Sequence, residues 1–247
     1  MELLRQGAHE LGIELSQAQL QAFVIYYREL LAWNSRFNLT AITESREVQT
    51  RHFLDSLTCL LAMAPRRADG ARDVSAVAGR AVDVGAGPGF PGLPLKIVCP
   101  SLEVVLVDSV GKKTKFLEHM VATLGLAGVT VVTARAEDLA HAPAHRDAYD
   151  YAVARALAPL PVLLEYCLPF LRLGGLLIAP KKGELAAEIA AAGPALRVLG
   201  GRWREPLAVP SSLLSDGRVL ILVDKVAPTP RLYPRRAGVP AKNPIHS

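Results

Sequence analysis

The chain has 247 residues, of which 51% are hydrophobic and 21% are charged, and its net charge of +5 is too small to identify a nucleic-acid-binding protein by itself. No apolar run reaches the roughly 20 residues that span a bilayer, and glutamates among the first residues argue against a signal peptide. Three widely spaced cysteines and six histidines without metal-ligand spacing predict neither disulfide bonds nor a metal site, so we expect a cytoplasmic protein.

Residues 1–64 have the pattern of an N-terminal helical extension. Residues 16–34 place apolar side chains at helical spacing after Ser16, a residue that suits an N-cap. Residues 44–63 are again amphipathic and follow a turn at 37–43. We therefore expect two principal helices here, ahead of a different kind of pattern.

From residue 80 to residue 225, short apolar runs alternate with helical patterns. The apolar runs are 81–85, 103–108, 129–134, 149–154, 175–180 and 218–224, and the clearest helical patterns are 111–125 and 159–173. This alternation predicts an α/β fold with a mostly parallel sheet that is covered on both faces. Residues 204–225 contain two apolar runs without a convincing helix between them, which predicts a closing hairpin and hence a mixed sheet.

Positive charge gathers in patches along the chain. The tail 226–247 has five prolines, which predict extended chain rather than helix, and it contains basic residues but no acidic ones. The patches comprise Arg231, Arg235, Arg236 and Lys242 in the tail, and Lys112, Lys113 and Lys115 before Glu118. Such patches suit contacts with phosphates, although solvated faces of a slightly basic enzyme account for them equally well.

The stretch "AVDVGAGPGFPG" (81–92) has the form of a cofactor loop. An apolar run reaches Asp83, and four glycines follow within eight residues: Gly85, Gly87, Gly89 and Gly92. Glycines at this density allow a ligand to approach the backbone closely. The dinucleotide fingerprint G-x-G-x-x-G requires a third glycine where this chain has Phe90. The frame D-x-G-x-G-x-G is instead typical of Rossmann-like methyltransferases, so we expect S-adenosylmethionine in this loop.

Acidic residues follow the next two apolar runs. Asp108 lies 19 residues after Gly89, where a carboxylate can bind both hydroxyls of a ribose or, alternatively, cap the next helix. Ala136 and Glu137 come after the third run, where they could meet the adenine edge, although Glu137 also suits the first turn of a helix. Asp83, at a buried strand end, needs donors from the loop amides or from a ligand ammonium group.

With these residues placed, the chain resembles a known family along most of its length. The matching segments are "FNLTAIT" (37–43), "RHFLDSL" (51–57), "DVGAGPGFPGLPLKIVCP" (83–100), "LVDSVGKKTKFLEH" (106–119), "ARAED" (134–138), "AVARALAPL" (152–160) and "YPRRAGVPAKNPI" (233–245). They resemble the small-subunit (16S) ribosomal RNA guanine-N7 methyltransferases, also called the glucose-inhibited division protein B family. One departure is "APKKG" (179–183), where the family more often has a methionine before a single Lys-Gly, and this leaves the roles of Lys181 and Lys182 open.

The resemblance implies a Rossmann-like methyltransferase of residues 80–225 that acts on small-subunit ribosomal RNA near the decoding region. It assigns contacts with S-adenosylmethionine to Gly85, Phe90, Ala136, Glu137 and Arg155. With the loop and strand-end residues, the expected cofactor set is Asp83, Gly85, Ala86, Gly87, Gly89, Phe90, Asp108, Ser109, Val110, Ala136, Glu137 and Arg155. The expected RNA-binding set is Arg51, Lys112, Lys113, Arg235 and Arg236, and we expect a monomer.

The expected chemistry needs neither a general base nor a nucleophile. Cys99 and Cys167 do not stand at strand ends facing the cofactor, which argues against a covalent intermediate. Guanine N7 has a free lone pair, and holding it in line with the methyl group can lower the barrier by roughly 7–11 kcal/mol.

Arg155 suits a cofactor carboxylate or a phosphate, with a structural ion pair as the alternative. His52 shares a helical face with Asp55, and a hydrogen bond to the core is favoured over contact with substrate.

Two other functions fit the same residues. One is a small-molecule S-adenosylmethionine methyltransferase with the N-terminal helices as a lid, and the other is a non-catalytic module that binds the cofactor. The basic patches favour RNA over a small metabolite. The combination of the glycine loop with Asp108 and Glu137 favours an enzyme over an inert fold.

Overall fold

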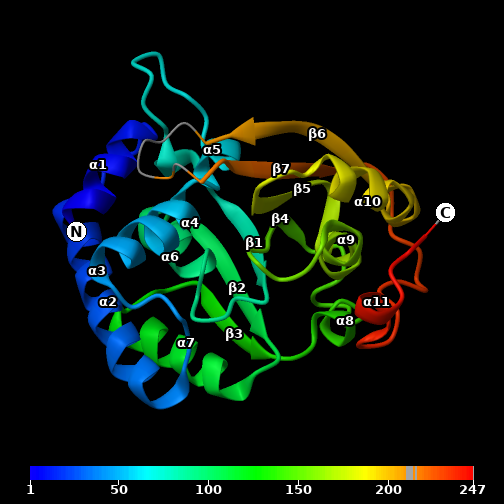
Figure 1. Cartoon of the computed structure of the whole chain (residues 1–247), viewed down its shortest axis with the longest axis horizontal. Helices are drawn as coiled ribbons and strands as arrows, with labels where there is room; N and C mark the ends of the chain where they lie inside the picture. Colours follow the sequence, from blue (N-terminus) through cyan, green and yellow to red (C-terminus); the bar gives the residue numbers. More distant parts are fainter. Residues whose placement is uncertain (210–213, 215, 247) are drawn as a thin grey trace.

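The computed structural model describes residues 1–209, 214 and 216–246, and it is built around one twisted sheet (Figure 1). The sheet has seven strands in the order β3-β2-β1-β4-β5-β7-β6. The strands are β1 Gly79–Val84, β2 Leu102–Asp108, β3 Val129–Thr133, β4 Tyr149–Val153, β5 Leu171–Lys182, β6 Gly201–Ala208 and β7 Arg218–Lys225. Strands β1 to β5 pair in parallel, and β7 runs antiparallel to both β5 and β6. The mixed, mostly parallel sheet confirms the predicted fold class.

Both faces of the central strands β1, β2 and β4 are mostly buried, as the apolar runs predicted, whereas the edge strands β3 and β6 are more exposed. Neighbouring residues of β2 belong to different clusters: Val104 packs in the cluster with the N-terminal helices, and Val105 packs in the cluster with the later helices. Because successive side chains of a strand point to opposite faces, a strand covered on both sides needs apolar residues throughout. The covering helices include α6 Gly92–Val98 and α7 Gly111–Thr123 on the first face, and α9 Leu160–Cys167 and α10 Ala186–Leu199 on the second.

The N-terminal segment packs against the first face (Figure 1). It comprises α1 Glu2–Glu10, α2 Gln17–Phe37, α3 Ser45–Glu47, η1 Val48–Leu54, α4 Asp55–Leu57 and α5 Leu60–Met63. Ser16 caps α2 as predicted, since its hydroxyl accepts from Gln19 N and the Gln19 side chain accepts from Ser16 N. The expected helix at 44–63 is instead divided, with a π-helical segment at η1.

Proline ends the helix expected at 159–173 earlier than its periodicity indicates. After α9, the short helix η3 Leu168–Phe170 contains Pro169, which has no N–H to continue an α-helix. Strand β5 begins immediately afterwards at Leu171. Residues 171–173 therefore belong to the sheet rather than to the helix.

The last part of the chain agrees with the sequence prediction in one respect and differs in another. The antiparallel pairing of β6 with β7 confirms the closing hairpin, although residues 210–213 and 215 of its connection lie outside the described part. The tail is not wholly extended, because α11 Val239–Lys242 forms one turn of helix with Pro240 near its start. Figure 1 shows α11 beside the short helix α8 Ala136–Leu139. No helix of the described residues is long and apolar enough to cross a membrane.

Candidate cofactor-binding site

A cavity of about 310 Å³ lies beyond the carboxyl ends of β1, β2 and β3. The strand order reverses here, because β1 pairs with β2 on one side and with β4 on the other. Open α/β sheets bind ligands at this kind of position. Six residues of the predicted cofactor set line the cavity: Gly85, Asp108, Ser109, Val110, Ala136 and Glu137.

Asp108 is held by the loops on either side of it. Its side chain is 6% exposed; Oδ2 accepts from Gly87 N at 2.9 Å and Oδ1 accepts from Val110 N at 2.9 Å. Lys113 Nζ lies 3.6 Å from Oδ2. The carboxylate thus orients the glycine loop and Val110, the residue before α7. Helix α7 has no side-chain cap, so Asp108 lies at the cavity wall and does not cap the helix.

Asp83 lies beneath the glycine loop with no solvent exposure. Its Oδ2 accepts from Gly92 N at 2.7 Å, whereas Oδ1 has no hydrogen-bond partner. Burial raises the pKa of this carboxyl to about 7, although the bond from Gly92 and the charge of Arg155 act in the opposite direction. One loop amide therefore supplies a donor, as the sequence predicted, and one buried oxygen remains unsatisfied.

Two glycines of the loop have different reasons to be glycine. Gly85 has φ +74°, and a Cβ there would approach Leu157 Cδ1 to 2.6 Å. Gly87 has φ +58°, but a Cβ there would meet only Gly85 O at 3.9 Å. The first glycine permits close packing against the loop after β4. The second leaves open space over the loop.

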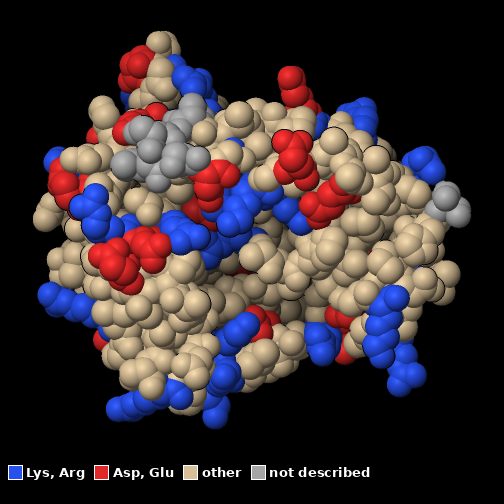
Figure 2. Space-filling view, in the orientation of Figure 1, with Lys and Arg blue, Asp and Glu red and all other residues tan. Residues whose placement is uncertain are grey.

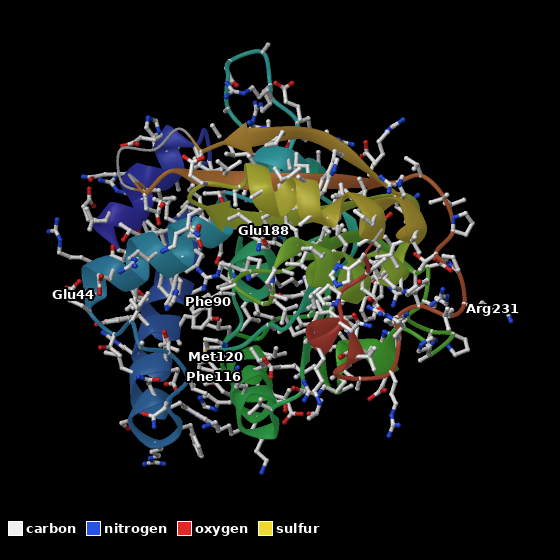
Figure 3. All side chains as sticks on the ribbon, turned by 45° about the vertical axis from the view of Figure 1, so that its right-hand side comes forward. Glu44, Phe90, Phe116, Met120, Glu188 and Arg231 are labelled. Carbon is white, nitrogen blue, oxygen red and sulfur yellow. The ribbon has the colours of Figure 1, made fainter. Side chains whose placement is uncertain are left out.

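Phe90 supports the loop from below and does not line the cavity. Its ring is 2% exposed and stacks on His52 at a centroid distance of 4.5 Å and on Tyr26 at 5.4 Å. The Tyr26 hydroxyl donates to Pro88 O at 2.6 Å. Figure 3 shows Phe90 between the N-terminal helices and the sheet. Asp83, Ala86, Gly87 and Gly89 are likewise outside the cavity lining, so these predicted contacts remain predictions.

Arg155 points to the N-terminal segment. Its Nη1 donates to Asp55 Oδ2 and to Arg51 O, both at 2.8 Å, and Nη2 lies 3.1 Å from His52 Nδ1. The guanidinium also lies over the Phe90 ring at 5.2 Å. These contacts match the structural ion pair that the sequence left as an alternative to a cofactor contact.

His52 is neutral and fully engaged in this network. Burial, with the adjacent Arg155 charge, lowers the pKa of His52 to about 3. Nδ1 lies 3.1 Å from Arg155 Nη2, which can only donate, and 3.2 Å from Arg51 O, which can only accept. Nε2 lies 2.9 Å from Thr40 Oγ1. The expected shared face of His52 and Asp55 is confirmed, because both side chains contact the same arginine.

Two predicted residues contact elements that the sequence did not suggest. Glu137 is 3% exposed and accepts from Gly238 N in the tail at 2.9 Å. Arg235, expected at RNA phosphates, instead donates through Nη2 to Glu165 Oε2 at 2.6 Å. The tail has no acid of its own, but the fully buried Glu165 of α9 neutralises Arg235. The contact of Arg235 with RNA remains a prediction, and two of its side-chain nitrogens, Nε and Nη2, already bind the Glu165 carboxylate.

The other RNA candidates are more accessible. Lys112 and Arg236 are exposed, Lys113 stands at the cavity, and Arg51 pairs with Glu47 at 2.8 Å on the surface. Figure 2 shows one face hollowed near its centre, with Lys and Arg side chains both above and below the hollow. The described residues contain no group of His, Cys, Asp and Glu side chains that could hold a metal ion.

Lys181 now has a role that the sequence left open. Its Nζ donates to Glu188 Oε1 at 2.6 Å and to Ala158 O at 3.0 Å, and Leu160 N donates to the same Glu188 oxygen at 2.6 Å. Glu188 and Lys181 therefore hold the loop between β4 and α9. Lys182 is exposed.

Sequence analysis missed several residues that line the cavity, among them Arg135, Leu157 and Tyr166. Arg135 is the second residue of the quoted "ARAED" motif and could have been included. Leu157 follows Ala156, whose φ of +52° marks a strained turn at the cavity. Tyr166 lies in an apolar helix, and only its place in the fold directs it to the site.

Two solved structures share the fold at low sequence identity. A candidate transferase of Pyrococcus horikoshii has a TM-score of 0.51 and 13% identity, covering 69% of this chain and 63% of that chain. A chain in the complex of the Haloferax volcanii Trm112 methyltransferase activator with a candidate methyltransferase also has a TM-score of 0.51 and 13% identity, covering 79% of this chain and 97% of that chain.

Sequence comparisons are more specific. A family model described as rRNA small subunit methyltransferase G matches residues 19–208. The ribosomal RNA small subunit methyltransferase G of Roseiflexus castenholzii is 49% identical over 247 residues, covering 99% of this chain and 100% of the relative. The protein of that name from Dehalococcoides mccartyi is 44% identical over 245 residues, with 99% and 100% covered. Together with the strand-end cavity, these matches show that the chain belongs to the rRNA small subunit methyltransferase G family.

Proposed function

We propose that this methyltransferase transfers a methyl group from S-adenosylmethionine to N7 of a guanine in small-subunit (16S) ribosomal RNA. The observation that carries the proposal is the cavity at the ends of β1, β2 and β3, where Gly85, Asp108 and Glu137 meet. Family membership supports ribosomal RNA as the substrate. Ribosomal RNA would in turn place the enzyme in the cytoplasm.

The residues present fit the proposed cofactor. The buried Asp83 Oδ1 lacks a donor, and the space above Gly87 would admit a ligand close to the backbone. Asp108, already oriented by two backbone N–H groups, would hold the ribose hydroxyls. When bound, S-adenosylmethionine supplies a methyl group on a positively charged sulfur. Ala136 and Glu137 would contact the adenine edge, and Ser109 and Val110 would complete the wall.

None of the three cysteines lines this cavity, which supports a single in-line transfer without a covalent intermediate. Cys59, Cys99 and Cys167 are fully buried, and burial raises the pKa of each thiol, that of Cys99 to about 12. His52 has both ring nitrogens engaged. Since guanine N7 carries no proton, the residues around the cavity need only orient the base and exclude water.

We expect different parts of the chain to bind the cofactor, to support the glycine loop and to contact the RNA. Residues 80–225 would bind the cofactor, and residues 1–64 buttress the glycine loop through Tyr26 and His52. RNA would cross the hollowed face, where Lys and Arg side chains gather (Figure 2). We expect Arg51, Lys112, Lys113 and Arg236 to contact its phosphates. Each of these residues carries a positive charge that suits a phosphate.

The decisive experiment incubates the protein with labelled S-adenosylmethionine and with separated ribosomal RNAs, free and in subunits. We expect label in the small-subunit RNA, recovered as 7-methylguanosine after digestion to nucleosides. Methylation of another RNA, of a different guanine atom, or of a small metabolite alone would contradict the proposal. A covalent adduct between enzyme and RNA would contradict the in-line mechanism.

A further inference from the structure

The C-terminal tail, residues 226–246, is fastened to the sheet domain at its beginning. Lys225 is 1% exposed, and its Nζ donates to Leu199 O at 2.9 Å and contacts Thr229 Oγ1, which also donates to Leu199 O at 2.8 Å. Arg146 donates to Thr229 O at 2.7 Å and to Tyr233 O at 2.9 Å. The first part of the tail is therefore fastened at Thr229 and Tyr233, although residues 226–228 and 230–232 are exposed.

A second anchor lies at Arg235. Its backbone N and its Nε both donate to Glu165 Oε1, at 2.7 and 2.9 Å, and Nη2 donates to Oε2 at 2.6 Å. Glu165 has no solvent exposure, whereas the Arg235 side chain is 20% exposed. A planar fork that meets both oxygens of a carboxylate is a specific, charge-assisted contact. It holds the tail in one register on α9.

Three residues later, the tail reaches the cofactor cavity. Gly238 N donates to Glu137 Oε1 at 2.9 Å, and Gly238 has φ +82°, a conformation that favours glycine. Glu137 stands on the four-residue helix α8, and Tyr166, next to Glu165 on α9, lines the same cavity. Burial raises the pKa of Tyr166, and the neighbouring Glu137 carboxylate raises it further. Glu137 is thus held between the tail and α9.

We propose that the tail is a strap that positions Glu137 for the cofactor, with Arg235 as the positioning residue and the Gly238 N–H as the direct contact. The inference rests on the proposed function, because it assigns Glu137 to S-adenosylmethionine. Arg235 does not contact Glu137 itself. Its ion pair with Glu165 fixes the register of the tail on α9, and this register brings Gly238 N to the Glu137 oxygen. The tail serves cofactor binding, and Arg236, exposed between these two contacts, is free for RNA.

The test is a double-mutant cycle on S-adenosylmethionine affinity, measured by calorimetry on the full chain. Arg235→Gln and Glu137→Gln should each raise the Kd about tenfold, and the double variant should match Glu137→Gln within about twofold, because coupled residues are non-additive. Lys242→Gln removes an exposed tail charge and should leave the Kd unchanged. Arg235→Lys should restore part of the affinity.

Arg235→Gln leaves Glu165 buried without its partner and can fail to fold, so the cycle is repeated with Glu165→Gln and Arg235→Gln combined, which leaves no unpaired charge. If the increase in Kd of the double variant is instead the product of the increases in the two single variants, Arg235 has only a general structural role and the inference is overturned. Wild-type affinity in a folded Arg235→Gln variant would overturn it as well. A wild-type chain that fails to bind S-adenosylmethionine would overturn the proposed function itself, and the positioning of Glu137 for that cofactor with it.

Discussion

Asp83 shows how one buried residue links the stability of this fold to pH. Its carboxyl has no solvent exposure, accepts one hydrogen bond and has a pKa raised to about 7, against about 3.9 in an unfolded chain. Between these values the folded state retains a proton that the unfolded state has released. Raising the pH through this window therefore lowers the free energy of unfolding, by up to about 1.4 kcal/mol per pH unit.

Asp83→Asn should remove this dependence, because the amide is neutral at every pH. We expect the stability of the variant relative to wild type to increase from pH 5 to pH 7 and to level off above pH 7. Urea denaturation at pH 5, 6, 7 and 8 measures the difference. A constant difference across the series would mean that Asp83 ionises in the folded chain as it does in the unfolded chain.

Gly87 offers a residue-scale test of the cofactor loop. A Cβ at Gly87 meets little protein, but its φ of +58° makes Gly87→Ala cost about 1–2 kcal/mol of stability. Gly125, at the end of α7, has φ +61° and nothing within 4 Å of its Cβ position, so Gly125→Ala is a matched control. Both variants should lose similar stability, and Gly87→Ala alone should lose S-adenosylmethionine affinity by at least about tenfold. Equal affinities in calorimetry would remove Gly87 from the site.

At the scale of elements, the segment from η1 to α4 connects the N-terminal helices to the loop after β4. Arg51 O, His52 and Asp55 all contact Arg155, and Arg218 Nε lies 3.1 Å from Asp55 Oδ1 without hydrogen-bond geometry. Asp55 is fully buried between the two guanidinium groups, whose side chains are 13% and 11% exposed. One carboxylate therefore joins three elements that are far apart in sequence.

Asp55→Asn should destabilise the fold by about 2–4 kcal/mol, because two partly buried guanidinium groups lose their common counter-charge. The control is Glu47→Gln, which removes the exposed ion pair with Arg51 on the same segment and should have a much smaller effect. Urea denaturation of both variants at neutral pH compares them. If the two substitutions cost the same, the Asp55 network does not join the elements energetically.

At the scale of the whole molecule, the proposed RNA path depends on charges that come from opposite ends of the chain. Lys112 stands at the start of α7, and Arg236 lies in the tail two residues before the contact with Glu137. Both side chains are exposed, and both elements contribute to the surroundings of one cavity. RNA that delivers a base to this cavity would pass both of them.

Lys112→Gln and Arg236→Gln should each weaken binding of small-subunit RNA and lower the slope of log affinity against log salt by about 0.7, the value for one phosphate contact of a single strand. Arg66→Gln is the control, since Arg66 is exposed on the loop before η2, which projects at the top of Figure 1. Filter binding between 50 and 300 mM salt, about the range over which such slopes are measured, gives the slopes. Unchanged affinity and slope in both variants would remove these residues from the RNA path.

Local patterns predicted much of this molecule. The alternation after residue 80 predicted the parallel strands, because a strand buried on both faces must be apolar throughout. The loop 83–92 and Asp108 were predicted because their function depends on spacing along one strand–loop–strand unit, and the structure brings Gly87 N to Asp108 at 2.9 Å. The same local reasoning predicted the Ser16 cap.

The tertiary structure decided the partners of side chains whose contacts are far away in sequence. Arg155 faces Asp55 rather than the cavity, Arg235 faces Glu165 rather than solvent, and Glu137 meets Gly238 across 101 positions. The sequence shows which residues are charged and need a counter-charge, but the tertiary fold determines which acidic residue is near enough to supply it. The sequence by itself therefore determined the alternating strands of the sheet and the glycine loop, because these depend on local periodicity and spacing, and its motifs carried the resemblance to the family. Only the fold decided which carboxylates pair with Arg155 and Arg235, because it brings the buried Asp55 and Glu165 within 2.8 and 2.6 Å of these guanidinium groups from 100 and 70 positions away in the sequence.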